Sequence, residues 1–275
     1  MSVPTPEERK AGIAGVFDRA AETYDQVGLE FFGPVADALV ARTAPQPGER
    51  VLDVGCGRGA SALRAARAVG RDGEVRAVDL APRMVEGLRT LATDLPWLRA
   101  EVGDAEQPPP GPWDVVQASL VLFFLPDLDE ALDRYREVLA PDGRLGLSWF
   151  GDEVDESWAQ QYDLIVESLP EEARPPRNLT AAGPFASVEA MEKVLGDHGF
   201  GDVTTTGTRV HLDFANPAQW WDWTWSQGQR TLLEQHRDRG TLDDVVARVQ
   251  PLLEARQREG RLSWWTDIYV TVARA

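Results

Sequence analysis

A glycine-rich turn between residues 51 and 60 has the residue types of a ligand-binding loop. It starts as a short apolar strand, passes through Gly55, Gly57 and Gly59, and continues into an alanine-rich helix. Glycine permits backbone angles and close approaches that a Cβ atom blocks, so a ligand can lie against this turn, near the free N–H groups of the helix start. The pattern therefore predicts a binding site, and a merely tight strand–helix turn is the alternative.

The acidic residues near the turn indicate which ligand it holds. Gly55, Gly57 and Ala60 fit the dinucleotide pattern G-x-G-x-x-G/A, and Asp79 follows at the spacing of a ribose-binding acid. Asp53 argues against a dinucleotide, because a carboxylate there would face the negatively charged pyrophosphate. S-adenosylmethionine (AdoMet) has no phosphate and carries an ammonium and a sulfonium group, which a carboxylate attracts. We therefore predict an AdoMet-binding loop, with an NAD(P)-dependent oxidoreductase as the alternative.

Strand and helix patterns alternate along the chain, which is typical of a parallel sheet with helices packed around it. Ligands of such sheets bind beyond the carboxyl ends of the strands, where Asp53, Asp79 and Asp104 all fall. We predict an α/β fold: a Rossmann-like, mostly parallel seven-stranded sheet (last strand antiparallel), with helices on both faces and a helical cap inserted between the late strands. The expected strands cover residues 50–54, 74–79, 98–102, 113–119, 143–149, 202–214 and 267–273, with helices at 59–69, 82–94 and 128–140.

Four segments resemble the motifs of the class I AdoMet-dependent methyltransferases, namely residues 53–59, 77–85, 102–106 and 113–127. The order and spacing are most similar to the small-molecule branch typified by the quinone C-methyltransferases. The resemblance implies that the acid of the second motif holds the ribose hydroxyls and that the acid of the third contacts the adenine amino group. The implied cofactor-binding residues are Asp53, Gly55, Cys56, Gly57, Gly59, Asp79, Leu80, Met84, Asp104, Ala105 and Ser119.

The segment after the fourth strand departs from the family pattern. Related sequences often carry a histidine-containing stretch there, whereas this chain has the apolar run 121–125. The run offers no acid–base group and predicts an apolar floor for the acceptor, with Phe124 as a contact. Plain core packing is the alternative.

The N-terminal segment is expected to form a lid. Residues 5–8 have the form of a capping box with proline at the first helical position, so a helix should follow. Residues 17–25 resemble the segment that closes over the cofactor in this family. Tyr24 is a candidate lid residue near the methionine moiety, with catalytic and substrate-binding roles, or else it packs at the helix end.

Four tryptophans between residues 220 and 225 mark a helix that opens at Asn216 and Pro217. They span more than one helical face, so one stripe cannot bury them all against the sheet. We predict that Trp221 and Trp225 contact the acceptor, because aromatic rings give large apolar contact area. The alternative is that these rings form the core of the cap. Pro251 is expected to bend or end a later helix.

The chain divides into four expected parts. Residues 1–45 form an N-terminal helical lid and 46–150 the AdoMet-binding core. Residues 151–187 and 215–262 form a helical substrate cap, and 188–214 and 263–275 complete the core sheet.

A general base is needed only if the acceptor must lose a proton during methyl transfer. His236 in the expected cap titrates in a useful range and is our candidate catalytic residue beside Tyr24. Weaker candidates are His211, Asp222 and Glu234, whereas His198 reads as a structural helix cap. Three scattered histidines and one cysteine give no metal-ligand spacing, so we predict no metal site.

Composition narrows the choice of partners and location. The formal net charge of −17 opposes binding to nucleic-acid backbones, and the cationic side chains are spread along the chain. One cysteine excludes an intrachain disulfide, and an apolar run long enough to span a membrane is missing. We expect a cytoplasmic protein without membrane insertion; the sequence leaves its oligomeric state open.

These observations predict an AdoMet-dependent methyltransferase that acts on a small hydrophobic or aromatic metabolite. O-, N- and C-methylation all remain open. Two alternatives to methyl transfer remain. One is the NAD(P)-dependent oxidoreductase named above, and the other is a protein of the same fold that binds or cyclises its substrate without methylating it.

Overall fold

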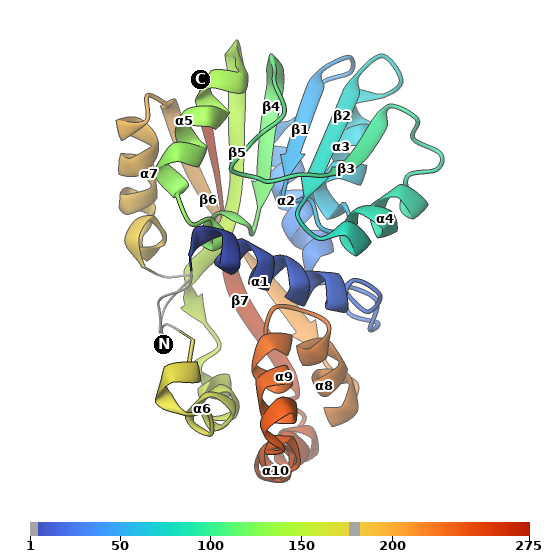
Figure 1. The fold of residues 1–275 in the computed structure, drawn as a ribbon, viewed down its shortest axis with the longest axis vertical. Helices are drawn as coiled ribbons and strands as arrows, with labels where there is room; N and C mark the ends of the chain where they lie inside the picture. The colour runs from blue at the N-terminus through green and yellow to red at the C-terminus, as the bar shows by residue number, and fades with distance from the viewer. Residues whose placement is uncertain (1–4, 176–181) are drawn as a thin grey trace.

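The computed structural model describes residues 5–175 and 182–275, which form one seven-stranded sheet with helices around it (Figure 1). The strand order is β3-β2-β1-β4-β5-β7-β6, with β7 antiparallel to both neighbours and the other described pairs parallel. This confirms the predicted fold class. The strands are β1 (Arg50–Val54), β2 (Glu74–Asp79), β3 (Leu98–Val102), β4 (Trp113–Ser119), β5 (Leu139–Val154), β6 (Gly201–Asp213) and β7 (Ser263–Arg274).

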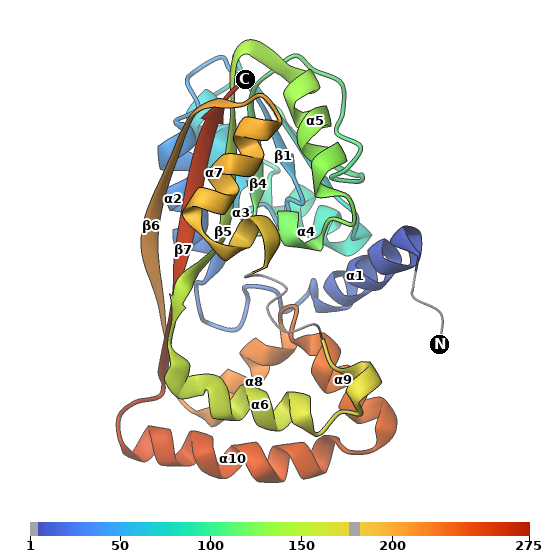
Figure 2. The ribbon, with the colours of Figure 1, turned by 90° about the vertical axis from the view of Figure 1, so that its left-hand side faces the viewer.

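Helices cover both faces of the sheet. One face carries α2 (Phe32–Thr43), α3 (Ala60–Val69) and α4 (Pro82–Leu91), which pack on one another or on β1–β3. The other face carries α5 (Leu128–Val138) and α7 (Val188–Asp197), which lie side by side in Figure 2. Helix α1 (Pro6–Ala20) begins at the predicted capping box of Thr5 and Glu8 and crosses the carboxyl ends of the strands.

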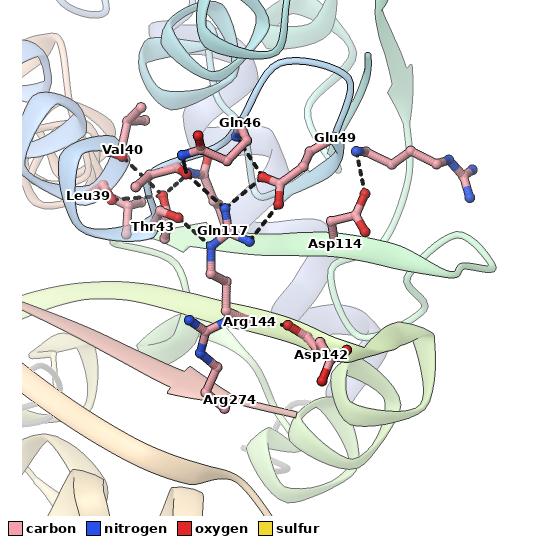
Figure 3. A network of polar contacts seen from close by, with 12 residues as sticks. Leu39, Val40, Thr43, Gln46, Glu49, Asp114, Gln117, Asp142, Arg144 and Arg274 are labelled. Atoms are coloured by element: carbon pink, nitrogen blue, oxygen red, sulfur yellow. Dashed lines mark hydrogen bonds and ion pairs between the residues drawn. The ribbon is translucent and has the colours of Figure 1, made fainter. Parts of the chain in front are cut away.

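A polar network fixes the opposite, amino-terminal edge of the sheet (Figure 3). The Arg144 guanidinium at the start of the β5–β4 pairing donates to the carbonyls of Thr43 and Ala44, where α2 ends, and to the Glu49 carboxylate. The Gln117 amide donates to the Thr43 hydroxyl at 2.7 Å. Because these groups are mostly buried, their hydrogen bonds fix how α2 lies on the sheet.

Four helices form a separate group below the carboxyl edge of the sheet, and we call them the cap helices. They are α6 (Ala159–Glu167), α8 (Pro217–Trp225), α9 (Arg230–Arg239) and α10 (Leu242–Arg258), with the last three inserted between β6 and β7 (Figure 2). At the edge of this group, the Trp158 ring just before α6 stacks on the Trp220 ring of α8, with the ring centroids 5.9 Å apart. We predicted that Pro251 bends or ends a helix; α10 continues through this residue, so Pro251 does not end it.

Four short 3₁₀ segments complete the description: η1 (Leu122–Phe124), η2 (Glu156–Trp158), η3 (Glu171–Ala173) and η4 (Gly183–Ala186). Segment η4 packs against α7 and β5 and thus stands apart from the cap helices, although we expected the cap to run to residue 187. Residues 176–181 of that expected cap lie outside the described part of the chain. Across the described residues, every helix is too short or too polar to cross a bilayer.

Candidate cofactor and acceptor site

Two cavities meet at the carboxyl ends of β1, β2 and β4. The first, the α1 pocket, lies beneath α1 and comprises about 720 Å³ of space, part of which is open to solvent. The second, the α3 pocket, has about 1010 Å³ and opens beside the start of α3. Tyr24, Gly55, Gly57 and Ser119 line both, so these four residues mark the junction. An extended ligand can therefore pass from one cavity into the other along the glycine-rich turn.

The glycine-rich turn needs glycine for both reasons predicted. Gly55, Gly57 and Gly59 have φ values of 63°, 52° and 88°, which side chains disfavour. A Cβ atom on Gly55 would also overlap the side chain of Val121. Cys56 within the turn is 8% exposed and lines the α3 pocket, and burial raises the pKa of its thiol. Gly59 is the N-cap of α3, and a Cβ atom at this position would overlap the side chain of Leu88.

Asp79 lines the α1 pocket and ties the turn to β2. Its Oδ2 accepts the N–H of Gly57 at 2.8 Å, and its Oδ1 accepts the N–H of Ala81 at 2.8 Å. Burial raises the pKa of this carboxyl group, although both backbone N–H groups oppose that shift. Each carboxylate oxygen keeps a further acceptor position, so Asp79 can hold ribose hydroxyls while it holds the turn.

Asp53 differs from Asp79 in the hydrogen-bond partners that surround it. The side chain is 1% exposed, and within the described chain neither carboxylate oxygen has a hydrogen-bond partner. Burial raises the pKa of Asp53 to about 8. The Ser61 hydroxyl and the Arg58 Nε, which also lack partners there, line the same α3 pocket. Buried polar groups without partners are costly, so this set fits a ligand that carries both an ammonium and a carboxylate.

Asp104 has a partner that the sequence gave no reason to expect. Its Oδ1 accepts the N–H of Glu106, and its Oδ2 accepts Lys10 Nζ from α1 at 2.7 Å. Lys10 also pairs with the Glu106 carboxylate. Burial lowers the pKa of Lys10, but the two carboxylates outweigh this effect and raise it. Lys10 lines the α1 pocket together with Leu80, Met84, Asp104 and Ala105, so the lid helix reaches the predicted adenine end.

The remaining wall of the α1 pocket is apolar. Phe124 and Phe17 meet edge to face at 5.5 Å, and Tyr24 stacks on Phe32 at 4.4 Å. Leu125, Pro126, Ile13 and Val121 complete this wall. The structure thus brings two predicted acceptor contacts, Tyr24 and Phe124, to the junction side of the pocket.

Ser119 is held at the junction by its neighbour across the sheet. Its hydroxyl lies 2.9 Å from the hydroxyl of Ser148, which also accepts the N–H of Leu120 at 3.1 Å. Leu120 has a φ of 53°, a rare conformation for leucine. The chain therefore turns sharply after Ser119, which lines both cavities, and Leu120 lines the α1 pocket alone.

His236 lies away from both cavities. The imidazole is fully buried among the cap helices, with Nδ1 2.8 Å from the Thr241 hydroxyl and Nε2 2.8 Å from the carbonyl oxygen of Ile165. Since both nitrogens are engaged and water cannot reach them, this placement argues against the predicted role as general base.

The predicted tryptophan contacts also lie elsewhere. Trp221 donates its indole N–H to Gln250 of α10 at 3.1 Å and meets Trp220 at 4.8 Å, so it belongs to the core of the cap helices. Trp225 lies beside the guanidinium groups of Arg230 and Arg237. The residues that line the two cavities include neither tryptophan. This arrangement favours the alternative interpretation, in which the rings pack against the cap itself.

The weaker base candidates are placed on surfaces or in ion pairs. His211 lies exposed on the edge strand β6 and Asp222 is exposed on α8. Glu234 accepts hydrogen bonds from Arg19 and Arg230; the Arg19 bonds lower its pKa to about 2, in spite of its burial. His198 occupies the C-cap of α7, as predicted, and pairs with Asp129 and Asp133 of α5.

Sequence comparisons identify the family. Residues 51–143 match the model of a methyltransferase domain. The chain is 37% identical to the nocamycin O-methyltransferase of Saccharothrix syringae over 234 residues, which is 80% of this chain and 83% of that protein. The chain belongs to the class I AdoMet-dependent methyltransferases. AdoMet is accordingly the cofactor of this methyltransferase, which agrees with the unpaired acid in the α3 pocket. Family membership also overturns the alternative of an NAD(P)-dependent oxidoreductase.

Two further relatives show the range of small-molecule chemistry in the family. The aklanonic acid methyltransferase DauC of Streptomyces sp. (strain C5) is 43% identical over 143 residues, covering 50% of this chain and 65% of its own length. A ubiquinone/menaquinone C-methyltransferase of Caulobacter sp. (strain K31) is 34% identical, over 58% of this chain and 69% of its own. The predicted likeness to quinone methyltransferases is therefore confirmed.

Solved structures share the fold at low sequence identity. The YcgJ protein of Bacillus subtilis superposes with a TM-score of 0.57 at 18% identity, over 88% of this chain and 97% of that one. The [4+2]-cyclase SpnF superposes with a TM-score of 0.56 at 17% identity, over 100% and 98%. At this identity the likeness concerns the fold alone.

Proposed function

We propose that the methyltransferase transfers a methyl group to an oxygen atom of a small, largely apolar acid. The observation that carries this proposal is the apolar wall of Phe17, Phe124 and Leu125, which leads directly to the junction of the two cavities at Tyr24 and Ser119. A hydrophobic or aromatic acceptor would gain most of its binding free energy on that wall.

The cofactor would extend through both cavities. Asp79, Leu80, Met84, Asp104 and Ala105 would hold the adenosine in the α1 pocket. In the α3 pocket, Asp53 would face the ammonium of the methionine end, with Ser61 and Arg58 on its carboxylate. Bound AdoMet supplies a methyl group on a cationic sulfur, so the transfer is an in-line displacement that depends on the placement of the two reactants.

None of the titratable groups that line the described α1 pocket is well suited to act as a general base. Asp79 and Asp104 already accept hydrogen bonds from Gly57, Ala81, Glu106 and Lys10. Histidine is missing from the described residues that line this pocket. An acceptor oxygen that is already ionised near neutral pH, such as a carboxylate or an acidic enol, needs no base. The name of the relative that matches over most of both chains, an O-methyltransferase, supports oxygen as the acceptor atom.

Tyr24 would act as a hydrogen-bond donor to the acceptor. Burial, and second the Asp79 carboxylate, raise its pKa well above the usual value, so the hydroxyl keeps its proton. Its ring is held between Phe32 and Phe17 over the turn at Gly57. A fixed donor at the junction can orient an anionic oxygen toward the methyl group, which is a positioning role.

The division of the chain supports this scheme. We propose that α1 is the lid of the cofactor pocket and that the cap helices close the far side of the acceptor space, because Gly228 between α8 and α9 faces Phe17. The acceptor would then bind between α1, η1 and the turn at Gly228.

The experiment is a screen with ¹³C-methyl AdoMet against carboxylic, enolic and phenolic aromatic metabolites, with their methylated forms as controls. We expect S-adenosylhomocysteine (SAH) to form in step with a product whose methyl carbon has the chemical shift of an ester or ether. A methyl carbon bound to nitrogen or carbon would refute O-methylation. Substrate conversion without SAH formation would instead establish the non-methylating alternative.

A further inference from the structure

Helix α1 crosses the carboxyl ends of the strands (Figure 1) and lines the α1 pocket. Ion pairs hold it near both of its ends. Toward its start, Lys10 pairs with Asp104 and Glu106 at the adenine end of the pocket. Toward its end, Arg19 pairs with Glu234 of α9. The two cations are nine residues apart, which is about 14 Å along a helix. The helix between them supplies Ile13, Ala14 and Phe17 to the pocket wall, so its position decides whether the pocket is covered.

Glu234 is well placed to fix this position. Its side chain is 9% exposed, and its two oxygens accept Arg19 Nε at 2.8 Å and Arg19 Nη2 at 2.5 Å. Arg230 Nε, one turn earlier on α9, donates to the same carboxylate at 2.8 Å. A two-point contact between a guanidinium and a carboxylate defines direction as well as distance. The arrangement therefore holds the Arg19 guanidinium in one orientation, which a loose ion pair on the surface does not do.

The helix that carries Glu234 is itself rigidly mounted. Leu233 and His236 on either side of it are fully buried, and His236 bonds both Thr241 and the Ile165 carbonyl of α6. Helix α9 lies next to α1 (Figure 2). The Arg19–Glu234 pair therefore links α1 to the cap helices. Further contacts of the lid reach the core, since Arg58 donates to the Ala21 carbonyl at 2.6 Å and the Arg83 N–H donates to Asp18. Phe17 of α1 also faces Gly228 of the cap, but that contact is apolar and does not fix an orientation as the Arg19–Glu234 pair does.

We infer that Glu234 is a positioning residue that, through Arg19, holds α1 over the bound cofactor and so slows cofactor release. The segment inserted between β6 and β7 then serves the cofactor as well as the acceptor. This inference depends on the AdoMet site and not on the identity of the acceptor, so it can be tested before any acceptor is known.

The test measures SAH binding and dissociation in the full-length protein with Glu234→Gln, Arg19→Met and the double variant. Glutamine keeps the shape of glutamate without its charge. Lys193→Met is the matched control, because it also removes one cation from an ion pair, with Asp197 on α7. Calorimetry gives the dissociation constant, and stopped-flow displacement gives the dissociation rate, both well below the unfolding temperature of each variant.

We expect each single variant to raise the dissociation constant for SAH about threefold to tenfold, mainly through faster dissociation. The double variant should be no weaker than Glu234→Gln alone, because both changes break the same contact. SAH binding equal to wild type in both single variants would overturn the inference, as would an equal change in Lys193→Met. If Glu234→Gln does not fold, Arg19→Met decides alone, since half of the Arg19 side chain is exposed and its loss is tolerated more easily. Failure of the wild-type protein to bind SAH would refute the cofactor site itself.

Discussion

Asp53 and Asp79 lie at the carboxyl ends of the neighbouring parallel strands β1 and β2, yet only Asp79 is hydrogen-bonded within the described chain. Asp79 holds two backbone N–H groups and therefore has a structural role before any ligand binds. Asp53 is buried without such partners, and its desolvation is uncompensated. Replacement of either acid should weaken SAH binding, but only replacement of Asp53 should also stabilise the ligand-free protein.

Replacement of Asp79 by alanine should weaken SAH binding by at least about tenfold, because it removes a charged acceptor of ligand hydroxyls and frees the Gly57 N–H. Isothermal titration with SAH checks this expectation. Asp79→Asn is the matched control, since its amide oxygen can still accept one hydrogen bond, and it should show a smaller loss. Unchanged affinity in Asp79→Ala would remove this residue from the cofactor site.

Asp53→Asn should stabilise the ligand-free protein at alkaline pH and weaken SAH binding. The carboxyl group has a pKa of about 8 in the folded protein and about 4 when unfolded, so the folded state keeps its proton between these values. Its contribution to stability therefore falls as pH rises from about 4 to 8. We expect wild type and variant to be equally stable near pH 4, and the variant to gain about 1–3 kcal/mol at pH 8.

Urea unfolding of both proteins at pH 4.5, 6 and 8 measures this difference. If the free energies of unfolding of the two proteins change in parallel over that pH range, the burial of the Asp53 carboxylate carries no net cost and the prediction is wrong. Added SAH should reverse the order at pH 8, because its ammonium compensates the wild-type carboxylate only.

His198 should stabilise the packing of α7 on α5 at acidic pH alone. Burial lowers the pKa of this imidazole, but the hydrogen bonds to Asp133 and Asp129 outweigh burial and raise it. A raised histidine pKa favours the folded state below about pH 6.5, and this contribution is lost as pH rises through the folded-state value. Because both carboxylates are largely exposed, we expect His198→Gln to cost only about 0.5 kcal/mol at pH 5.5 and nothing at pH 8.5. Thermal unfolding at the two pH values checks this, and SAH affinity should stay constant.

Two aromatic substitutions should separate the acceptor wall from the core of the cap helices. Phe124→Ala should raise the KM for the acceptor about tenfold or more with little change in SAH affinity, because this ring belongs to the apolar wall on which we propose that the acceptor binds. Trp221→Ala should instead lower the free energy of unfolding by about 2–3 kcal/mol, since its indole packs on Trp220 and bonds Gln250. A selective rise in acceptor KM for Trp221→Ala, without loss of stability, would restore this residue as an acceptor contact.

The sequence alone determined the sheet and the acids at its carboxyl edge. Alternating strands and helices place Asp53, Asp79 and Asp104 beside one another whatever the details of side-chain packing, because parallel strands end at the same edge. The glycines of the turn could also be recognised from the sequence. All three have a positive φ, and Gly55 has no room for a Cβ atom beside Val121. Local sequence is therefore enough to predict where the cofactor binds.

Only the tertiary structure decided how the helices face one another. Trp221 and His236 are residue types that often occur in binding sites, but their orientation follows from how the cap helices pack. In this packing both side chains point into the core of the cap helices. Lys10, Arg19 and Glu234 gave no signal as a group, because contacts between α1, the strand ends and α9 join segments more than 90 residues apart in the chain. Side-chain pairing over such separations depends on the relative placement of whole elements, which periodicity and spacing within one element do not define.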